Sequence, residues 1–185
     1  AVFVFTNENK TELGSIAAEN NGGTDAFASN FSYTGPAGII TATLVAEGAV
    51  YIHGITIENA AEIIGSNGLT DVWDFGAAQL DNAEYNNILT EDTINAWYTG
   101  VTAGTEGTLI PDTFTNGVLT WVGQAEKDRL RTTNSNLTRY DTDAKSDEYT
   151  GRFYVNSSST SRYFSIELNA GDELTIYASS SADQG

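Results

Sequence analysis

Cysteine and methionine are both absent from this sequence of 185 residues, and histidine occurs only once. Without cysteine there is no disulfide, no thiolate metal site, no iron–sulfur cluster and no cysteine nucleophile. The single histidine, His53, leaves a histidine-based zinc or copper site with too few ligands. No serine lies in the G-x-S-x-G motif of the hydrolases that use a Ser–His–Asp triad. An enzyme with a carboxylate pair stays open as an alternative, but we expect a protein that is not an enzyme.

Positive charge is scarce, because eight Lys and Arg residues face 25 Asp and Glu residues and give a formal net charge of −17. Nucleic acid and anionic membrane surfaces repel such a chain, so neither is expected as a partner. No apolar run reaches the roughly 18 residues of a membrane-spanning helix, so no membrane insertion is expected. The chain opens at Ala1 without a signal peptide, which we interpret as a trimmed start. An acidic composition free of cysteine and methionine predicts an extracellular protein that resists oxidation.

Hydrophobic residues make up 40% of the chain, enough to form a core. Their arrangement is typical of strands, because apolar and polar residues alternate in short runs separated by glycine and asparagine. The predicted strands are 1–6, 11–17, 39–46, 50–57, 72–75, 118–122, 129–133, 149–156, 163–168 and 174–178. Their spacing predicts an all-β protein, an antiparallel β-sandwich of jelly-roll type.

Two turns and one helix complete the predicted fold. Asn7-Glu8-Asn9 predicts the turn between the first two strands. The residues from Asn169 to Asp172 predict a hairpin between 162–168 and 173–178. Thr90 is a good N-cap, and the acids that follow it favour the start of one short helix over Glu91–Tyr98.

The few cations are concentrated, since seven of the eight fall between positions 127 and 162, together with five acids. Arg129 and Arg131 are two residues apart, so on a strand they share one face. One interpretation is that these arginines pair internally with acids, where a surface pair contributes about 0–1 kcal/mol. The other is a surface that binds the carboxylates of an anionic ligand. The candidates for that role are Arg129, Arg131, Arg139 and Arg152.

Aromatic rings near these cations are candidates for stacking on sugar rings. Tyr140, Tyr154 and Tyr163 lie in or beside the basic window, where a ring and a guanidinium can contact a uronate together. Trp121 lies close to the window, with burial in the core as the alternative. Tyr98 follows a tryptophan on the predicted helix, and the 100° step between neighbours allows one of the two to face outward.

A calcium ion is the one cofactor that the sequence suggests. Asp141, Asp143 and Asp147 space oxygen ligands rather like a calcium loop. The segment lacks the glycine and the final glutamate of an EF-hand, and Lys145 lies inside it. The alternative is a solvated acidic loop.

Two blocks of sequence are similar to one protein family. The first contains Val72-Trp73-Asp74-Phe75, then 85–90 and 94–98; the second joins 129–134 to 137–141. Over about 70–178 the chain resembles β-sandwich modules attached to secreted bacterial pectate lyases and pectin esterases, which are regarded as carbohydrate-binding-like. The resemblance implies binding of an acidic plant polysaccharide such as pectin, and it brings no catalytic residues.

The order of the strands differs from that family. Residues 1–58 look like the strands that end those modules, 70–185 look like their beginning, and 59–69 would be the connector. We therefore expect a single sandwich domain over 1–185 in circularly permuted order. A second hypothesis is a structural subunit of an extracellular fibre, which self-associates when the strand at 1–6 completes a neighbour's sheet.

Overall fold

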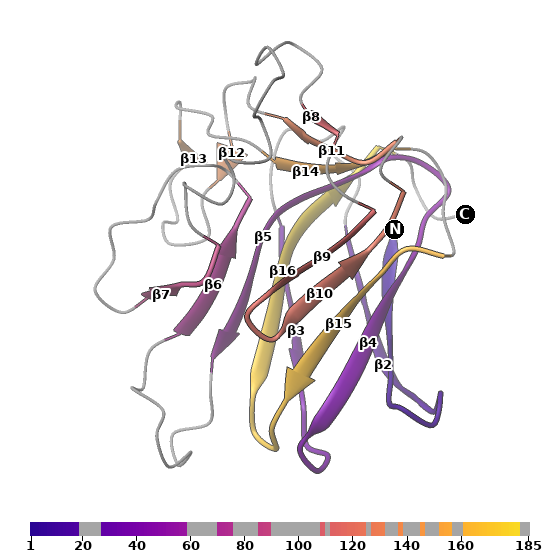
Figure 1. Cartoon of the computed structure of the whole chain (residues 1–185), viewed down its shortest axis with the longest axis vertical. Coiled ribbons are helices and arrows are strands. Elements are labelled where there is room, and N and C mark those ends of the chain that lie inside the picture. Colours follow the sequence, from indigo (N-terminus) through magenta and orange to yellow (C-terminus); the bar gives the residue numbers. More distant parts are fainter. Residues whose placement is uncertain are drawn as a thin grey trace.

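The computed structural model describes residues 1–18, 27–58, 70–75, 85–89, 108–109, 112–124, 127–131, 137–138, 145–146, 152–156 and 161–181. Within these ranges every regular element is a strand, and two sheets pack against each other as a sandwich (Figure 1). The predicted all-β sandwich is therefore confirmed. The helix predicted over 91–98 and the connector at 59–69 lie outside the described residues.

One sheet, here called sheet A, has six strands in the order β2-β1-β4-β15-β10-β9. They are β1 (Val2–Thr6), β2 (Glu12–Ala17), β4 (Gly38–Val45), β9 (Thr113–Asn116), β10 (Leu119–Val122) and β15 (Tyr163–Leu168). Alternate residues are buried, as Phe3 and Phe5 of β1 show, and the residues between them lie on the outer face. Strand β9 has no counterpart among the predicted strands.

The other sheet, sheet B, has the order β3-β16-β5-β14-β11-β8; β6 pairs with β5, and β7 pairs with β6 in parallel. Its strands are β3 (Phe27–Ser32), β5 (Val50–Glu58), β6 (Thr70–Asp74), β7 (Tyr85–Asn87), β8 (Thr108–Leu109), β11 (Arg129–Arg131), β14 (Arg152–Val155) and β16 (Glu173–Ser180). The short strands β12 (Leu137–Thr138) and β13 (Lys145–Ser146) pair with each other. Strand β3 was also not predicted.

Both sheets mix strands from the beginning and the end of the chain. In sheet A, β15 lies between β4 and β10, and in sheet B, β16 lies between β3 and β5. Strand β1 pairs with β2 on one side and with β4 on the other. Both edges of the first strand are therefore hydrogen-bonded within the chain, so β1 has no free edge for pairing with a neighbouring subunit.

The hairpin predicted at 162–178 is wrong. Strand β15 belongs to sheet A and β16 to sheet B, so the residues between them cross from one sheet to the other. In this connection the Asn169 amide donates to Asp172 Oδ2 at 2.8 Å, and Gly171 adopts a positive φ of 94°. The turn at Glu47-Gly48 also leads from sheet A to sheet B. Alternation predicts which face of a strand is buried but not which strand lies next to it.

The turn between β1 and β2 is confirmed. The Lys10 amide donates to the Asn7 carbonyl at 2.9 Å, and the Thr11 amide donates to Asn7 Oδ1 at 2.9 Å. Lys10 has a φ of 62°, in the left-handed region that glycine and asparagine adopt most readily. The side chain of Asn7 thus fixes a turn in which a lysine takes an unfavourable backbone conformation.

Candidate binding surfaces

Three of the predicted arginines and one predicted tyrosine share a face of sheet B. In the antiparallel pair of β11 and β14, Arg129 lies opposite Tyr154 and Arg131 lies opposite Arg152. Residues directly opposite each other lie on the same face of a sheet. Phe153, which alternates with them on β14, is buried, so the four positions belong to the outer face. We call these four residues the arginine–tyrosine face.

Tyr154 also lies opposite Tyr51 of β5, and the two rings stack with their centroids 5.1 Å apart at an interplanar angle of 28°. The Tyr154 hydroxyl donates to Asn156 Oδ1 at 3.2 Å. Both rings are half-buried, so their conformations are restrained while part of each surface stays accessible. A restrained aromatic pair can stack on a sugar ring at little cost in side-chain entropy.

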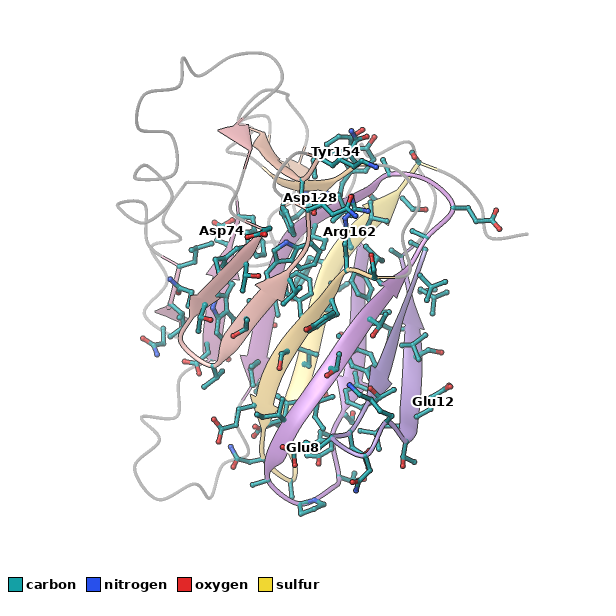
Figure 2. All side chains as sticks on the ribbon, turned by 45° about the vertical axis from the view of Figure 1, so that its right-hand side comes forward. Glu8, Glu12, Asp74, Asp128, Tyr154 and Arg162 are labelled. Atoms are coloured by element: carbon teal, nitrogen blue, oxygen red, sulfur yellow. The ribbon has the colours of Figure 1, made fainter. Side chains whose placement is uncertain are left out.

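Arg162 does not take part in this face. It is buried, and its Nε lies 3.0 Å from both carboxylate oxygens of Asp128, which is also buried (Figure 2). A second guanidinium nitrogen donates to the Asn156 carbonyl at 3.1 Å. For this arginine, internal pairing with an acid is the correct interpretation. Because Asp128 directly precedes Arg129, the ion pair anchors the start of β11 and so positions the arginine–tyrosine face.

Burial raises the pKa of Asp128 above its usual range, because removal from water disfavours the carboxylate. The hydrogen bond from the Gln124 amide, 2.7 Å from Oδ2, and the positive charge of Arg162 lower the pKa but do not offset the effect of burial. The ion pair is therefore a structural element that stays sensitive to pH.

Trp121 lies in the core, with no exposed area. Its ring meets Phe153 edge to face at a centroid distance of 4.5 Å, and Phe164 lies 4.6 Å away. The inward side of β10 carries Trp121, so its ring offers no face to a ligand at the surface. This placement corrects its selection as a ligand-binding residue and matches the core alternative.

The remaining predicted site residues lie outside the described residues. These are Tyr98, Arg139, Tyr140 and the candidate calcium ligands Asp141, Asp143 and Asp147. Within the described part of the chain, no group of three or more acidic or histidine side chains could hold a metal ion. The same part contains no helix of the length and hydrophobicity needed to cross a membrane.

The outer face of sheet A carries two rows of mostly hydroxyl-bearing side chains that were not predicted from the sequence. One row crosses five strands as Thr6, Thr41, Ser165, Thr120 and Thr115, and the other as Val4, Thr43, Tyr163, Val122 and Thr113. We call these ten residues the hydroxyl face. The alternation within each strand is visible in the sequence, but the rows exist only once the strand order is known.

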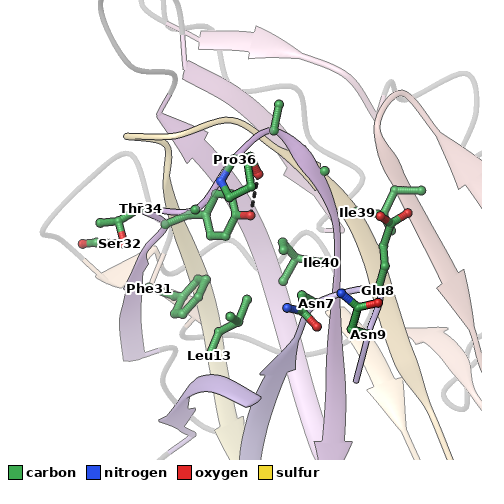
Figure 3. A pocket seen from close by; sticks show the side chains of 14 residues that line it. Asn7, Glu8, Asn9, Leu13, Phe31, Ser32, Thr34, Pro36, Ile39 and Ile40 are labelled. Carbon is green, nitrogen blue, oxygen red and sulfur yellow. Dashed lines mark hydrogen bonds between the residues drawn. The ribbon is translucent and has the colours of Figure 1, made fainter. Parts of the chain in front are cut away.

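An open hollow of about 380 Å³ lies on the hydroxyl face. It is lined by Lys10, Tyr163 and outward residues of β4, β10 and β15. A second hollow, of about 300 Å³, lies at one end of the sandwich between the β1–β2 turn and residues 31–40 (Figure 3). There the buried Tyr33 hydroxyl donates to the Pro36 carbonyl at 2.6 Å, and the exposed Leu13 lies at the rim.

No family model, no curated protein and no solved structure matches this chain.

Proposed function

We propose that this protein is an extracellular, non-catalytic β-sandwich that binds an acidic polysaccharide of pectin type, as the resemblance to modules of pectate lyases and pectin esterases implies. The observation that carries the proposal is the register of β11 and β14, which brings Arg129, Arg131 and Arg152 to one face beside Tyr154. The crossings from β4 to β5 and from β15 to β16 support the jelly-roll assignment. The short helix over 91–98 and the permuted order remain part of the proposal.

The chemistry of the arginine–tyrosine face suits a chain of uronate units. A planar guanidinium can donate two parallel hydrogen bonds to a carboxylate, and such charge-assisted bonds are about twice as strong as neutral ones. The stacked rings of Tyr51 and Tyr154 supply an aromatic surface on the sheet face to which the three arginine positions belong. In this arrangement a guanidinium binds the carboxylate of a sugar unit while the aromatic surface contacts the ring of the same unit.

The net charge of −17 opposes the binding of an anionic polymer. At physiological ionic strength, however, charges are screened over about 8 Å, so acids elsewhere on the molecule act weakly at this face. We therefore expect affinity to depend on the local cations. Added salt should weaken binding at the guanidinium contacts themselves.

The test is the affinity for polygalacturonate of the intact chain and of the double variant Arg129→Ala plus Arg131→Ala, measured by isothermal titration calorimetry. A hydrogen bond to a charged group is worth about 1.5–3 kcal/mol, so losing two such groups should weaken binding at least tenfold. Lys127→Ala is the matched control, because this exposed lysine lies outside the arginine–tyrosine face. Unchanged affinity in the double variant would show that this face does not bind the polymer.

The second hypothesis, a fibre subunit joined by strand exchange, requires β1 to leave its place between β2 and β4. Size-exclusion chromatography at two concentrations tests it directly. An apparent mass of 19.8 kDa at both concentrations would eliminate self-association, and a mass that grows with concentration would support it.

A further inference from the structure

The hydroxyl face differs chemically from the rest of this acidic chain. Eight of its ten positions carry a hydroxyl group and none carries a charge, although the chain has 25 acidic residues. Threonine favours strands, which accounts for its frequency on an outer face. Strand preference does not account for the missing acids or for the tyrosine in the middle of the face. The nearest acids along these strands are Glu167, two residues beyond Ser165, and Glu12, opposite Thr6 on the edge strand.

Lys10 places a positive charge at this uncharged surface. Its side chain lines the hollow together with Tyr163, Thr41 and Thr43. Within the part of the chain that the structure describes, its ammonium group forms no ion pair. Its backbone has a φ of 62°, where glycine would fit without steric conflict. Backbone strain of this kind is found preferentially at functional sites, which favours a functional role for this lysine.

We propose that the hollow on the hydroxyl face is a second glycan-binding site, which takes one sugar unit bearing a carboxylate. The Lys10 ammonium pairs with the carboxylate, and the half-buried ring of Tyr163 contacts the apolar face of the sugar. Threonine and serine hydroxyls both donate and accept hydrogen bonds, as sugar hydroxyls do. The class of ligand, a carboxylated glycan, rests on the proposed function. The residues of this second site are different from those of the arginine–tyrosine face.

The side chains of this face favour a carboxylated sugar over a second copy of this chain. A sheet-to-sheet contact here would bury only two valines, Val4 and Val122, among hydroxyl groups. Stable interfaces between copies have an apolar core that this face lacks. A carboxylated sugar carries the negative charge that complements the Lys10 ammonium group.

The experiment titrates the full chain with trigalacturonate and with its methyl ester by isothermal titration calorimetry. We expect two trigalacturonate molecules per chain and weaker binding of the ester. Tyr163→Ala and Lys10→Gly should each abolish binding at the hydroxyl face and leave the other binding event unchanged. Arg129→Ala plus Arg131→Ala should abolish only the binding event at the arginine–tyrosine face. Lys127→Ala is the control for the loss of one lysine charge, and it should leave both events unchanged.

Two milder variants keep the inference testable if a larger change disturbs folding. Thr43→Val preserves the branched shape of the side chain but removes its hydroxyl, and it should weaken the second event about threefold to tenfold, as expected for one hydrogen bond. Glu167→Gln removes the acid two residues beyond Ser165 on β15 and should strengthen the same event. Lys10→Gly should leave the midpoint of thermal unfolding unchanged or raise it, because glycine relieves the strain of the turn.

The possible failures separate this inference from the proposed function. A single binding event that is lost only in the arginine double variant would overturn the second site and leave the proposed function standing. A single event that is lost only with Tyr163→Ala or Lys10→Gly would overturn the arginine–tyrosine face and support the hydroxyl face. Absence of any binding to trigalacturonate or polygalacturonate would overturn both. A change in oligomeric mass in Tyr163→Ala, without any loss of sugar binding, would identify the face as a contact between copies.

Discussion

Replacing Arg162 by methionine should destabilise the fold strongly, because it leaves the Asp128 carboxylate buried without its partner. The guanidinium donates from Nε to Asp128 and from a terminal nitrogen to the Asn156 carbonyl at 3.1 Å and to Gln124 Oε1 at 3.4 Å, and all of these hydrogen bonds are lost. Removing one partner of a buried ion pair typically costs about 3–5 kcal/mol. This is a large part of the roughly 5–15 kcal/mol that stabilises a domain.

Equilibrium unfolding in urea measures this cost. With a slope of about 2 kcal/mol per molar urea, a loss of about 4 kcal/mol lowers the midpoint by about 2 M. The cost should shrink at acidic pH, because without Arg162 the pKa of Asp128 rises further and the carboxyl group becomes neutral. The double variant Asp128→Asn plus Arg162→Met keeps an acceptor for the Gln124 amide and should recover at least half of the loss. A loss below about 1 kcal/mol, or a double variant no more stable than Arg162→Met, would refute this reasoning.

Three further predictions concern stability. Gly123→Ala should cost about 1–3 kcal/mol in urea unfolding, because a Cβ there would overlap with Trp121 and Asp128; an unchanged midpoint would contradict the close packing. Gly117→Ala should cost about 1–2 kcal/mol, since Gly117 has a φ of 61° and a Cβ would meet Ile88; circular dichroism during heating measures the loss, and a midpoint equal to that of the wild type would contradict it. The stabilising contribution of Asp128 is fully present below its ordinary pKa of about 4 and is lost as the pH rises through the raised folded pKa. The free energy of unfolding of the wild type minus that of Asp128→Asn should therefore fall as the pH rises over that range. A difference that grows with pH would contradict the upward direction of the pKa shift of Asp128.

Much of the sandwich could be predicted from alternation within single strands. The predicted strand at 163–168 matches β15 without error, because its aromatic and aliphatic residues alternate cleanly with polar ones. Strand β3 was missed because small and polar residues, among them Ser29 and Asn30, interrupt its alternation. The crossing at 169–172 was mistaken for a hairpin because a four-residue connection can join strands of one sheet or of two.

The candidate surfaces were predictable to different degrees. The spacing of Arg129 and Arg131 predicted a shared face, and the register of β11 with β14 adds Arg152 and Tyr154 to it. The burial of Arg162 with Asp128 could not be predicted, since 34 residues separate the two side chains. The hydroxyl face depends on five strands from distant parts of the chain, so no pattern within one segment indicates it.

The central positions of β15 and β16 constrain how the molecule reaches its native state during synthesis. These two strands leave the ribosome after all the others described, yet each must insert between strands made earlier. Until they do, β4, β10, β3 and β5 have unsatisfied hydrogen-bonding edges, which can pair with other chains. Folding should therefore be slow and predominantly post-translational, as expected for long-range pairing. A nascent chain stalled before residue 163 should be readily captured by chaperones or digested by proteases.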